Sequence, residues 1–489
     1  MSNLADHLSL NAHRYADDVA VIGKRQTYTY HGLAEIVALV AGGLRSCGVD
    51  EGDRVVYQVS NGPVASVLYY AILTAGAVAV PLNPLLSRSE TEQICRRAEP
   101  RIFLGEHPAY DPDIPISHPE AVGLLLQDSG NRITVPVARA GHDPAVLFFT
   151  SGTTGRPKGV VLSHDNLRTN AEWVYKMSLG PEVWGPGHIT AAVLPLSHSF
   201  AMTCMQNAAL LSGAAIAYQA RFDARKLLGL IREVGVTAIA LVPPAAKALL
   251  EAWKTVPGPV PLAYCLVGGA PIPPELIQDL EESMDLVVVE GYGLTETSPV
   301  CAFRTPEMLR KSGSVGRAAG FAKLALLGPT DQIFPTGEGE LLVSGPGVMS
   351  AYLDLTSNDS GEPAFVDGWF RTGDIARIDE DGDVFVIDRK KDLINRNGYN
   401  VSPVEVEQAL TGIQGVIDAG VVGIPDTEAG EEIAAFVVVS DDGVASESLM
   451  ASCASVLALY KRPRTITIVS SIPRGSKGQV LRDRLCPVS

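Results

Sequence analysis

The spacing of apolar residues along the first 290 positions predicts strands and helices in alternation. Residues 28–47 begin as a short strand and continue as an amphipathic helix, and a helix over 62–75 precedes another strand. The same alternation returns between 189 and 289, with expected strands at 191–194, 214–218 and 238–242 and expected helices at 202–211 and 223–234. Such alternation is typical of largely parallel sheets covered by helices, so we expect an α/β fold with two α/β sub-domains.

The pattern changes in the last third of the chain. Short apolar runs rich in glycine over 313–386 predict a small barrel-like β sub-domain. After Lys391 a compact α+β unit is expected, with helices at 403–410 and 446–459 and strands at 416–422, 433–439 and 466–469. We therefore predict a large N-terminal domain over residues 1–390 and a smaller C-terminal domain over 391–489.

Composition narrows the possible functions. A formal net charge of −16 over 489 residues argues against nucleic acid or an anionic membrane as a partner. The longest apolar segments, 67–82 and 208–218, are too short or too interrupted for a membrane span. Seven cysteines without a CxxC pair favour reduced thiols, and no signal peptide is recognisable, so we expect a cytoplasmic protein.

The segment Phe-Phe-Thr-Ser-Gly-Thr-Thr-Gly-Arg-Pro-Lys-Gly-Val over 148–160 carries the clearest chemistry. The apolar run 145–149 predicts a buried strand that leads into it. Exposed amides, hydroxyls and one cation replace the hydration of phosphate oxygens, so we expect a polyphosphate-binding loop. The spacing differs from that of the common GxxxxGK[ST] nucleotide loop. The expected nucleotide-binding residues here are Thr150, Ser151, Gly152, Thr153, Thr154 and Lys158.

This loop resembles the signature of the acyl-CoA synthetase, adenylation-domain and luciferase superfamily, whose members activate carboxylic acids as acyl-adenylates. The resemblance extends over nearly the whole chain. It implies ATP or acyl-AMP, Mg²⁺ and CoA as ligands, and a mobile C-terminal lid domain that swings about a hinge at Lys391.

A second segment, Glu-Gly-Tyr-Gly-Leu-Thr-Glu-Thr, follows the apolar run 286–289. Glycines on both sides of Tyr292 leave its ring able to stack on a purine. Thr295 offers a hydroxyl to the α-phosphate, and Glu296 offers Mg²⁺ the oxygen ligand that this ion prefers. The resemblance implies a turn after residue 267 as the other wall of the adenine slot. The nucleotide-binding residues expected here are Gly269, Ala270, Pro271, Glu290, Gly291, Tyr292 and Gly293.

A third segment runs from 367 to 389. Asp374 can accept both ribose hydroxyls, and Arg389 can donate to the same sugar or to the phosphate. A Gly-Asp pair alone is typical of a solvated turn, but its order after the other two segments favours a nucleotide site.

The segment around His198 resembles the one that lines the acyl pocket of the superfamily. There the matching histidine gates the pocket and helps to admit the thiol, although a lone histidine is often structural. No acidic residue lies between 200 and 205, so an α-ammonium group has no partner. Apolar Phe200, Met202 and Met205 favour an aryl, alicyclic or medium aliphatic acid. Gly398 and Tyr399 match the segment that packs against pantetheine, which implies CoA or a carrier protein as acyl acceptor.

The C-terminal motif departs from the superfamily pattern. That pattern, Pro-Arg-Thr-x-Ser-Gly-Lys-x-x-Arg, ends in a lysine that binds the substrate carboxylate and α-phosphate during adenylation. Aligned on Pro473, Gly478 and Arg482, this chain has Gln479 at the lysine position, and Lys477 lies two residues earlier. A neutral amide does not offset the charge of the transition state.

Three functions remain open on this sequence. The first is a ligase weak in adenylation that converts a preformed acyl-adenylate and CoA into acyl-CoA, with a separate adenylating enzyme as supplier in a biosynthetic pathway. The second is a complete ATP-dependent ligase in which Lys477 substitutes for the missing lysine. The third is a non-catalytic adenylate-binding protein, which the retained phosphate loop and carboxylates disfavour.

Overall fold

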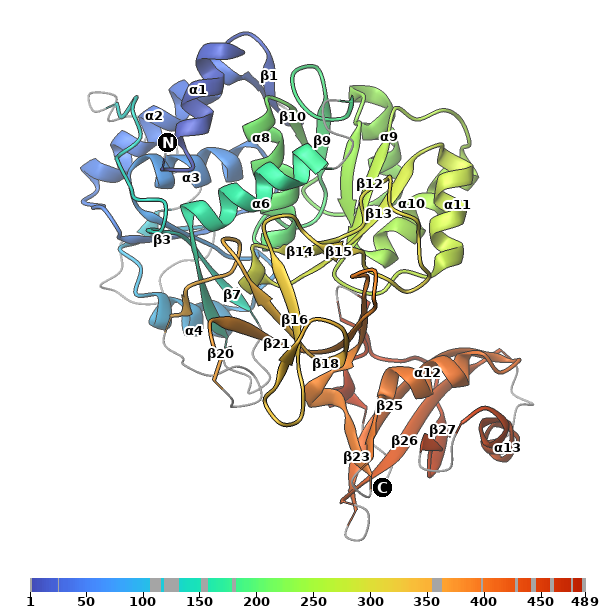
Figure 1. Ribbon diagram of the computed structural model, residues 1–489. Coiled ribbons are helices and arrows are strands. Elements are labelled where there is room, and N and C mark those ends of the chain that lie inside the picture. Colours follow the sequence, from blue (N-terminus) through green and yellow to red (C-terminus); the bar gives the residue numbers. More distant parts are fainter. Residues whose placement is uncertain are drawn as a thin grey trace. The chain divides into compact units, whose positions relative to one another are not determined.

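The computed structural model describes residues 2–24, 26–105, 116–117, 132–150, 157–177, 182–353, 363–396, 399–426, 430–440, 446–457, 461–475 and 478–485. The chain forms two compact units (Figure 1). The first comprises residues 1–324 and 343–370, and the second comprises 325–342 and 371–489.

The first unit contains a seven-stranded sheet in the order β19-β8-β7-β4-β3-β5-β6. Its strands are β3 (Arg54–Gln58), β4 (Val78–Pro81), β5 (Ile102–Gly105), β6 (Ile116–Ser117), β7 (Pro144–Thr150), β8 (Lys158–Ser163) and β19 (Ala351–Tyr352). Neighbours among β3, β4, β5, β6 and β7 pair in parallel, whereas β7 and β8 form an antiparallel pair and β19 closes the edge beside β8.

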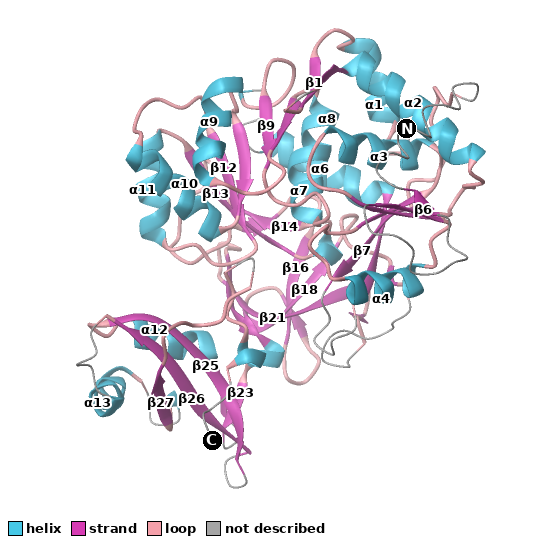
Figure 2. Cartoon of the chain, turned by 180° about the vertical axis from the view of Figure 1, so that it is seen from behind, coloured by secondary structure: helices cyan, strands magenta, loops and turns pink. Residues whose placement is uncertain are grey.

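A second sheet of the first unit has nine strands in the order β15-β14-β13-β12-β11-β9-β10-β1-β2. Its strands are β1 (Val19–Ile22), β2 (Thr27–Thr29), β9 (Ile189–Ala192), β10 (Ala215–Tyr218), β11 (Ala238–Leu241), β12 (Tyr264–Gly268), β13 (Val287–Gly293), β14 (Val300–Phe303) and β15 (Arg317–Ala318). Helices α9 (Ala224–Val234), α10 (Pro243–Thr255) and α11 (Pro274–Met284) cover one face (Figure 2).

The remaining helices of the first unit contribute to its largest apolar core, which also takes residues from both sheets. They are α1 (Asp6–Arg14), α2 (Tyr30–Ser46), α3 (Pro63–Thr74), α6 (His164–Met177), α7 (Ser199–Ala201) and α8 (Ala208–Ser212), with α4 (Arg88–Ala98) on a smaller cluster. Between α7 and α8 lies a π-helical segment, η2 (Met202–Asn207), so one helix runs from Ser199 to Ser212 with a widened middle. All six η2 residues are buried.

Two further sheets account for most of the second unit, although residues 323–324, 343–344, 365–366 and 369–370 of their strands belong to the first unit. One has the order β17-β16-β18-β21, with β22 also on β21, and the other has the order β24-β23-β26-β25, with β27 on β26. The strands are β16 (Lys323–Leu327), β17 (Ile333–Phe334), β18 (Gly337–Ser344), β21 (Trp369–Ile378), β22 (Val384–Arg389), β23 (Ile394–Arg396), β24 (Tyr399–Val401), β25 (Val416–Asp426), β26 (Gly430–Val439) and β27 (Thr465–Ile468). The short β20 (Phe365–Val366) pairs with the start of β21. Helix α12 (Pro403–Thr411) packs against β25, and α13 (Ser446–Val456) packs against β27.

The predicted α/β class is confirmed, with several sheets in the large part of the chain and a small α+β C-terminal part. The expected helix over 202–211 is present, although it begins earlier and is partly π-helical. No helix among the described residues is both long and apolar enough to cross a lipid bilayer.

Candidate active site

The phosphate loop connects two antiparallel strands of the seven-stranded sheet. Thr150 ends β7 and Lys158 begins β8, and the two residues pair directly across the strands. Lys158 is only 6% exposed, which is rare for lysine. Ser151, Gly152, Thr153 and Thr154 lie outside the described residues.

A tyrosine that the sequence analysis did not select links this lysine to the predicted magnesium ligand. Tyr352 lies on β19, which pairs with β8, and the Lys158 ammonium lies 5.2 Å from the centre of its ring. The Tyr352 hydroxyl donates to Glu296 Oε1 at 2.9 Å. The structure therefore brings Lys158 and Glu296 to opposite parts of one buried tyrosine, and their roles toward phosphate and Mg²⁺ stay predictions.

Thr295 and Glu296 lie on a one-turn 3₁₀ helix, η3 (Thr295–Thr297), directly after β13. The Glu296 carbonyl accepts the Met349 amide at 2.8 Å, which fixes the backbone of the turn. Gly293 is required immediately before it, because a Cβ atom there would lie 1.6 Å from the Pro299 carbonyl oxygen. The backbone of the turn is therefore fixed on both sides, and this sets the positions from which the Thr295 and Glu296 side chains start.

The predicted adenine slot is consistent with the strand order. β12 and β13 are parallel neighbours, and Gly268 pairs with Gly291. The turn Gly269–Pro271 thus leaves the sheet at the edge where half-buried Tyr292 lies. A Cβ atom on Gly268 would lie 3.0 Å from the Gly291 carbonyl oxygen and 3.3 Å from the Phe200 ring, so a larger residue there would have to displace these neighbours by a few tenths of an ångström.

Glu290 belongs to a network of partly buried charges. Its carboxylate lies 3.9 Å from Arg310, whose guanidinium also donates twice to Glu281 at 2.9 Å. Burial raises the pKa of Glu290, and the charges of Arg310 and Arg304 oppose that rise. The Glu290 carbonyl accepts the Arg304 amide at 3.1 Å, and the predicted contact of Glu290 with nucleotide stays a prediction.

The segment after His198, which is expected to line the acyl pocket, contacts the turn that carries Thr295 and Glu296. Ser199 donates from its hydroxyl to Thr295 Oγ1 at 3.3 Å, and exposed His198 precedes the first turn of the helix. The Asn61 side chain fixes the preceding loop, because it donates to the Leu194 carbonyl at 2.8 Å and accepts the Leu196 amide at 2.9 Å. The structure thus brings the expected acyl segment and the expected phosphate-binding threonine together.

The predicted ribose pair lies in the second unit. Asp374 on β21 and Arg389 on β22 pair across the strands, and Arg389 Nε lies 2.6 Å from Asp374 Oδ1. Asp374 is only 2% exposed, whereas the Arg389 side chain is 41% exposed. A buried carboxylate fixed by a partly exposed guanidinium is suited to recognise a polar ligand such as a sugar.

The C-terminal motif forms a tight turn, again within the second unit. Leu481 donates to the Pro473 carbonyl, and Gly475 donates to the carbonyl of Gln479, both at 2.8 Å. A Cβ atom on Gly475 would lie 2.3 Å from Gln479 Nε2, so the Gln479 side chain lies directly over this glycine. Gln479 itself is exposed at the turn.

Four other predicted positions have no described side chain. Gly398 and Lys477 lie outside the described residues. The backbone of Tyr399 belongs to β24, and that of Lys391 belongs to the short 3₁₀ helix η4 (Lys390–Asp392).

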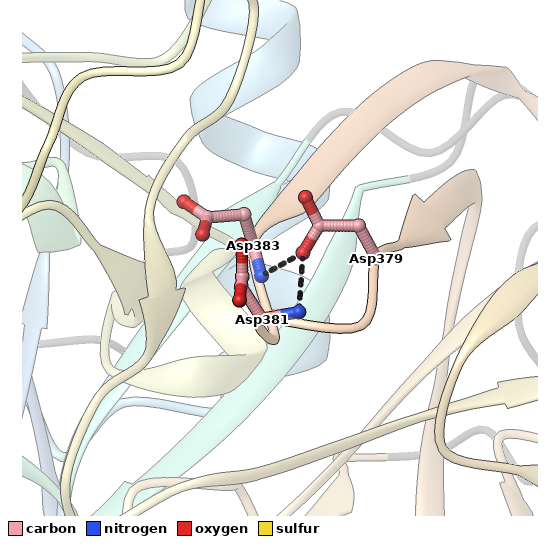
Figure 3. A group of neighbouring side chains, drawn as sticks. All are labelled: Asp379, Asp381 and Asp383. Carbon is pink, nitrogen blue, oxygen red and sulfur yellow. Dashed lines mark hydrogen bonds between the residues drawn. The ribbon is translucent and has the colours of Figure 1, made fainter.

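One group of three acidic side chains occurs among the described residues, in the turn between β21 and β22 (Figure 3). Asp379 Oδ1 accepts the backbone amides of Asp381 and Asp383 at 3.1 and 2.9 Å, so the Asp379 carboxylate stabilises the turn itself. We assign no metal site to them.

Comparisons with known proteins agree with this geometry. A model of the AMP-binding enzyme family matches residues 8–353, and a model of the AMP-binding enzyme C-terminal domain matches residues 405–479. The chain is 33% identical to a feruloyl-CoA synthase of Amycolatopsis, over 93% of this chain and 92% of that protein. It is 30% identical to a long-chain-fatty-acid–CoA ligase of Bacillus subtilis, over 98% and 93%.

Two solved structures share the fold of this chain, and both contain bound ligands. ATP-bound MatB of Rhodopseudomonas palustris is 27% identical with a TM-score of 0.86, and the match covers 98% of each chain. The o-succinylbenzoate coenzyme A synthetase of Bacillus subtilis, in complex with ATP and a magnesium ion, is 27% identical with a TM-score of 0.85, over 98% of each chain. ATP and Mg²⁺ are thus ligands of relatives with this fold, and CoA is the thiol substrate of acyl-CoA ligases. The chain therefore belongs to the AMP-binding enzyme family of AMP-forming acyl-CoA ligases, within the acid–thiol ligases, and carries the C-terminal domain of that family.

Proposed function

We propose that this protein forms acyl-CoA thioesters from acyl-adenylates and CoA, and that its own adenylation of free acids is slow. The observation that carries the proposal is the residue at position 479, a glutamine where the family pattern has its catalytic lysine. A separate adenylating enzyme would then supply the acyl-adenylate.

The register that places Gln479 there is supported by contacts on both sides of the turn. Arg482 donates to Glu407 at 2.9 Å, and Arg474 and Val480 form a β-bridge. The Arg474 guanidinium donates to the Gly478 carbonyl at 2.7 Å and also pairs with the Asp418 carboxylate. A slip by two residues that brought Lys477 to the lysine position would break several of these contacts together.

The expected effect differs between the two half-reactions. During adenylation, negative charge builds on the carboxylate and α-phosphate, and removal of one preorganised donor typically costs about 10² to 10³ in rate, or roughly 3 to 4 kcal/mol. The family lysine is turned away during thioester formation, so that step depends mainly on the position of the thiol relative to the carbonyl carbon. We therefore expect Gln479 to impair the first step selectively.

The retained residues fit the ligands of both steps. The buried Lys158 ammonium suits a phosphate, Glu296 offers the carboxylate oxygens that Mg²⁺ prefers, and Tyr292 has a ring suited to stack on adenine. We assign the ribose to Asp374 and Arg389, and the thiol gate to His198. Pantetheine is assigned to Gly398 and Tyr399, with residues 391–489 as a lid hinged at Lys391. Bound Mg²⁺ would neutralise phosphate charge during adenylation.

We expect the substrate acid of this protein to belong to one of the classes on which its relatives act. These act on feruloyl and long-chain fatty acyl groups, and Phe200, Met202 and Met205 supply apolar surface for either an aryl or an aliphatic group. The cysteines that the structure describes, at 47, 95, 204, 265, 301 and 453, carry free thiols, which supports a reducing cytoplasmic setting.

The test compares the wild type with Gln479→Lys and with Gln479→Met, a neutral control of similar length. One assay follows pyrophosphate release from free acids, ATP and Mg²⁺, and the other follows acyl-CoA formation from synthetic acyl-adenylates and CoA. We expect Gln479→Lys to raise the first rate about 10² to 10³-fold and to leave the second nearly unchanged, whereas Gln479→Met raises neither. Rapid pyrophosphate release by the wild type, lost in Lys477→Met, would instead identify a complete ligase that uses Lys477.

A further inference from the structure

A groove between α9 and α10 opens to solvent on the helical face of the nine-stranded sheet. Its volume is about 430 Å³, and Leu228, Ala252 and Val256 make its lining mostly apolar. Arg225 and Arg232 also line the groove, two helical turns apart on α9. Arg232 Nη2 donates to two backbone carbonyls at 2.8 and 3.3 Å, and within the described residues no carboxylate pairs with either guanidinium. The groove therefore offers apolar surface between two cations that lack an anionic partner.

Gly229 lies between these two arginines on α9 and lines the same groove. Glycine is among the least favourable residues inside a helix, and an isolated one usually has a packing or functional reason. Packing within the chain does not supply that reason among the described residues, because a Cβ atom at position 229 would meet nothing within 4 Å. The open space beside Gly229 is available to a group from another molecule.

Helix α11 carries the opposite charge on the same face of the sheet. It lies beside α10, so the three helices form one layer (Figures 1 and 2). Residues 274–285 contain five acidic residues and no lysine or arginine. Glu275, Asp279 and Glu282 are all exposed at a spacing that places them on one face of the helix. Because Glu282 lies in the last turn, where the helix dipole disfavours anions, helix stability does not explain this composition.

The cations of α9 and the anions of α11 have the same spacing. Both helices have 11 residues, with Arg225 and Glu275 each second and Arg232 and Glu282 each ninth. The two helices also run in the same direction, because each connects neighbouring parallel strands of one sheet. A two-fold rotation about an axis parallel to the helices therefore places α11 of one copy over the groove of the other, and the reverse. This rotation brings Arg225 opposite Glu275 and Arg232 opposite Glu282.

We propose that this face is a dimer interface, in which α11 of each copy occupies the groove between α9 and α10 of a second copy. The three helices have 11, 13 and 11 residues. Such a layer measures roughly 20 Å by 30 Å, so two copies would bury about 1,200 Å² in total, at the lower end for a specific interface. We expect a dissociation constant on the order of 10 µM and a strong dependence on salt. The inference goes beyond the proposed function and does not depend on it.

The test measures self-association of the full chain by sedimentation equilibrium, at concentrations on both sides of the expected dissociation constant. We expect the wild type to dimerise reversibly at about 0.05 M NaCl, with a dissociation constant roughly tenfold higher at about 0.5 M because salt screens exposed charges. Arg232→Glu and Glu282→Arg should each raise the dissociation constant about tenfold at low salt, because the symmetry repeats every pair and each reversal turns attraction into repulsion. The double variant restores opposite charges and should return to within about threefold of the wild type.

Net charge alone does not produce this pattern. Arg232→Glu changes the formal net charge from −16 to −18 and Glu282→Arg changes it from −16 to −14, yet both should weaken the dimer. Arg96→Glu, a charge reversal of an exposed α4 residue away from this face, should leave the dissociation constant unchanged. A wild type that stays monomeric at every concentration would overturn the inference. So would single variants that associate like the wild type, or a double variant that stays as weak as the single ones.

Discussion

The carboxyl group of Glu407 makes the stability of the second unit depend on pH near neutrality. Glu407 lies on α12, where its Oε1 accepts from the Val421 amide and from Arg482, each at 2.9 Å. Its side chain is 14% exposed. Burial raises the pKa of Glu407 from 4.5 to about 7, and the attraction of Arg482 only partly opposes this effect.

The size and sign of the effect follow from linkage. Between pH 4.5 and 7 the folded chain holds a proton on Glu407 that the unfolded chain has lost. The free energy of unfolding therefore falls as pH rises through this window, by up to about 3 kcal/mol at 1.36 kcal/mol per pKa unit. Above pH 7 both states are ionised, and the contribution of this group no longer changes.

The perturbation that isolates this group is Glu407→Gln, which keeps an acceptor for the Val421 amide and removes the titration. Wild type and variant are compared by hydrogen exchange of peptides from β25 in urea between pH 5 and 8. This measurement reports the second unit itself, which matters because two units need not unfold together. We expect the variant to gain opening free energy relative to the wild type up to pH 7 and to keep that difference above it. A difference that stays constant over the whole range, or that shrinks as pH rises, would refute the reasoning.

Two further substitutions test the first unit. Tyr352→Phe keeps the ring but removes the hydrogen bond to Glu296. We expect the free energy of unfolding to fall by about 1.5 to 3 kcal/mol in urea, and the Mg²⁺ concentration needed for pyrophosphate release to rise. Unchanged values of both quantities would contradict the contact. Gly293→Ala forces a Cβ atom onto the Pro299 carbonyl and should lower the free energy of unfolding by more than about 3 kcal/mol. In the control Gly229→Ala the added Cβ meets nothing within 4 Å, so the free energy of unfolding should rise by about 0.5 to 1 kcal/mol. Equal melting temperatures for the two variants would show that the turn at Gly293 relaxes.

Much of the fold and part of the site could be predicted from local sequence patterns. Apolar runs located the parallel strands, and the ends of parallel neighbours meet at one edge of a sheet. For that reason the turn at Gly269 and the ring of Tyr292 could be expected together, as β12 and β13 have them. Lys158 was selected because its loop carries hydroxyls and glycines in one short segment, and its contact with phosphate stays a prediction.

The contacts that complete the site depend on pairings that local patterns do not encode. Tyr352 follows an ordinary Gly-Val-Met-Ser-Ala stretch, and only the addition of β19 beside β8 brings it to Lys158 and Glu296. The π-helical segment was equally hidden, because all six of its residues are buried and no polar face reveals the change in helical period. Gln206 accepts a hydrogen bond from Ser66 on α3, and Ser66 in turn contacts Tyr218 on β10, both far away in the sequence.

The position of β19 at the edge of its sheet also bears on synthesis of the chain. While the ribosome extends the polypeptide, β8 has β7 on one side, but its other edge stays unpaired until residues 351–353 emerge and Leu353 donates to the Gly159 carbonyl at 2.7 Å. An exposed edge rich in valine is a template for association with other chains. The β8 edge of the nascent protein is therefore open to association with other chains between the emergence of β8 and that of β19.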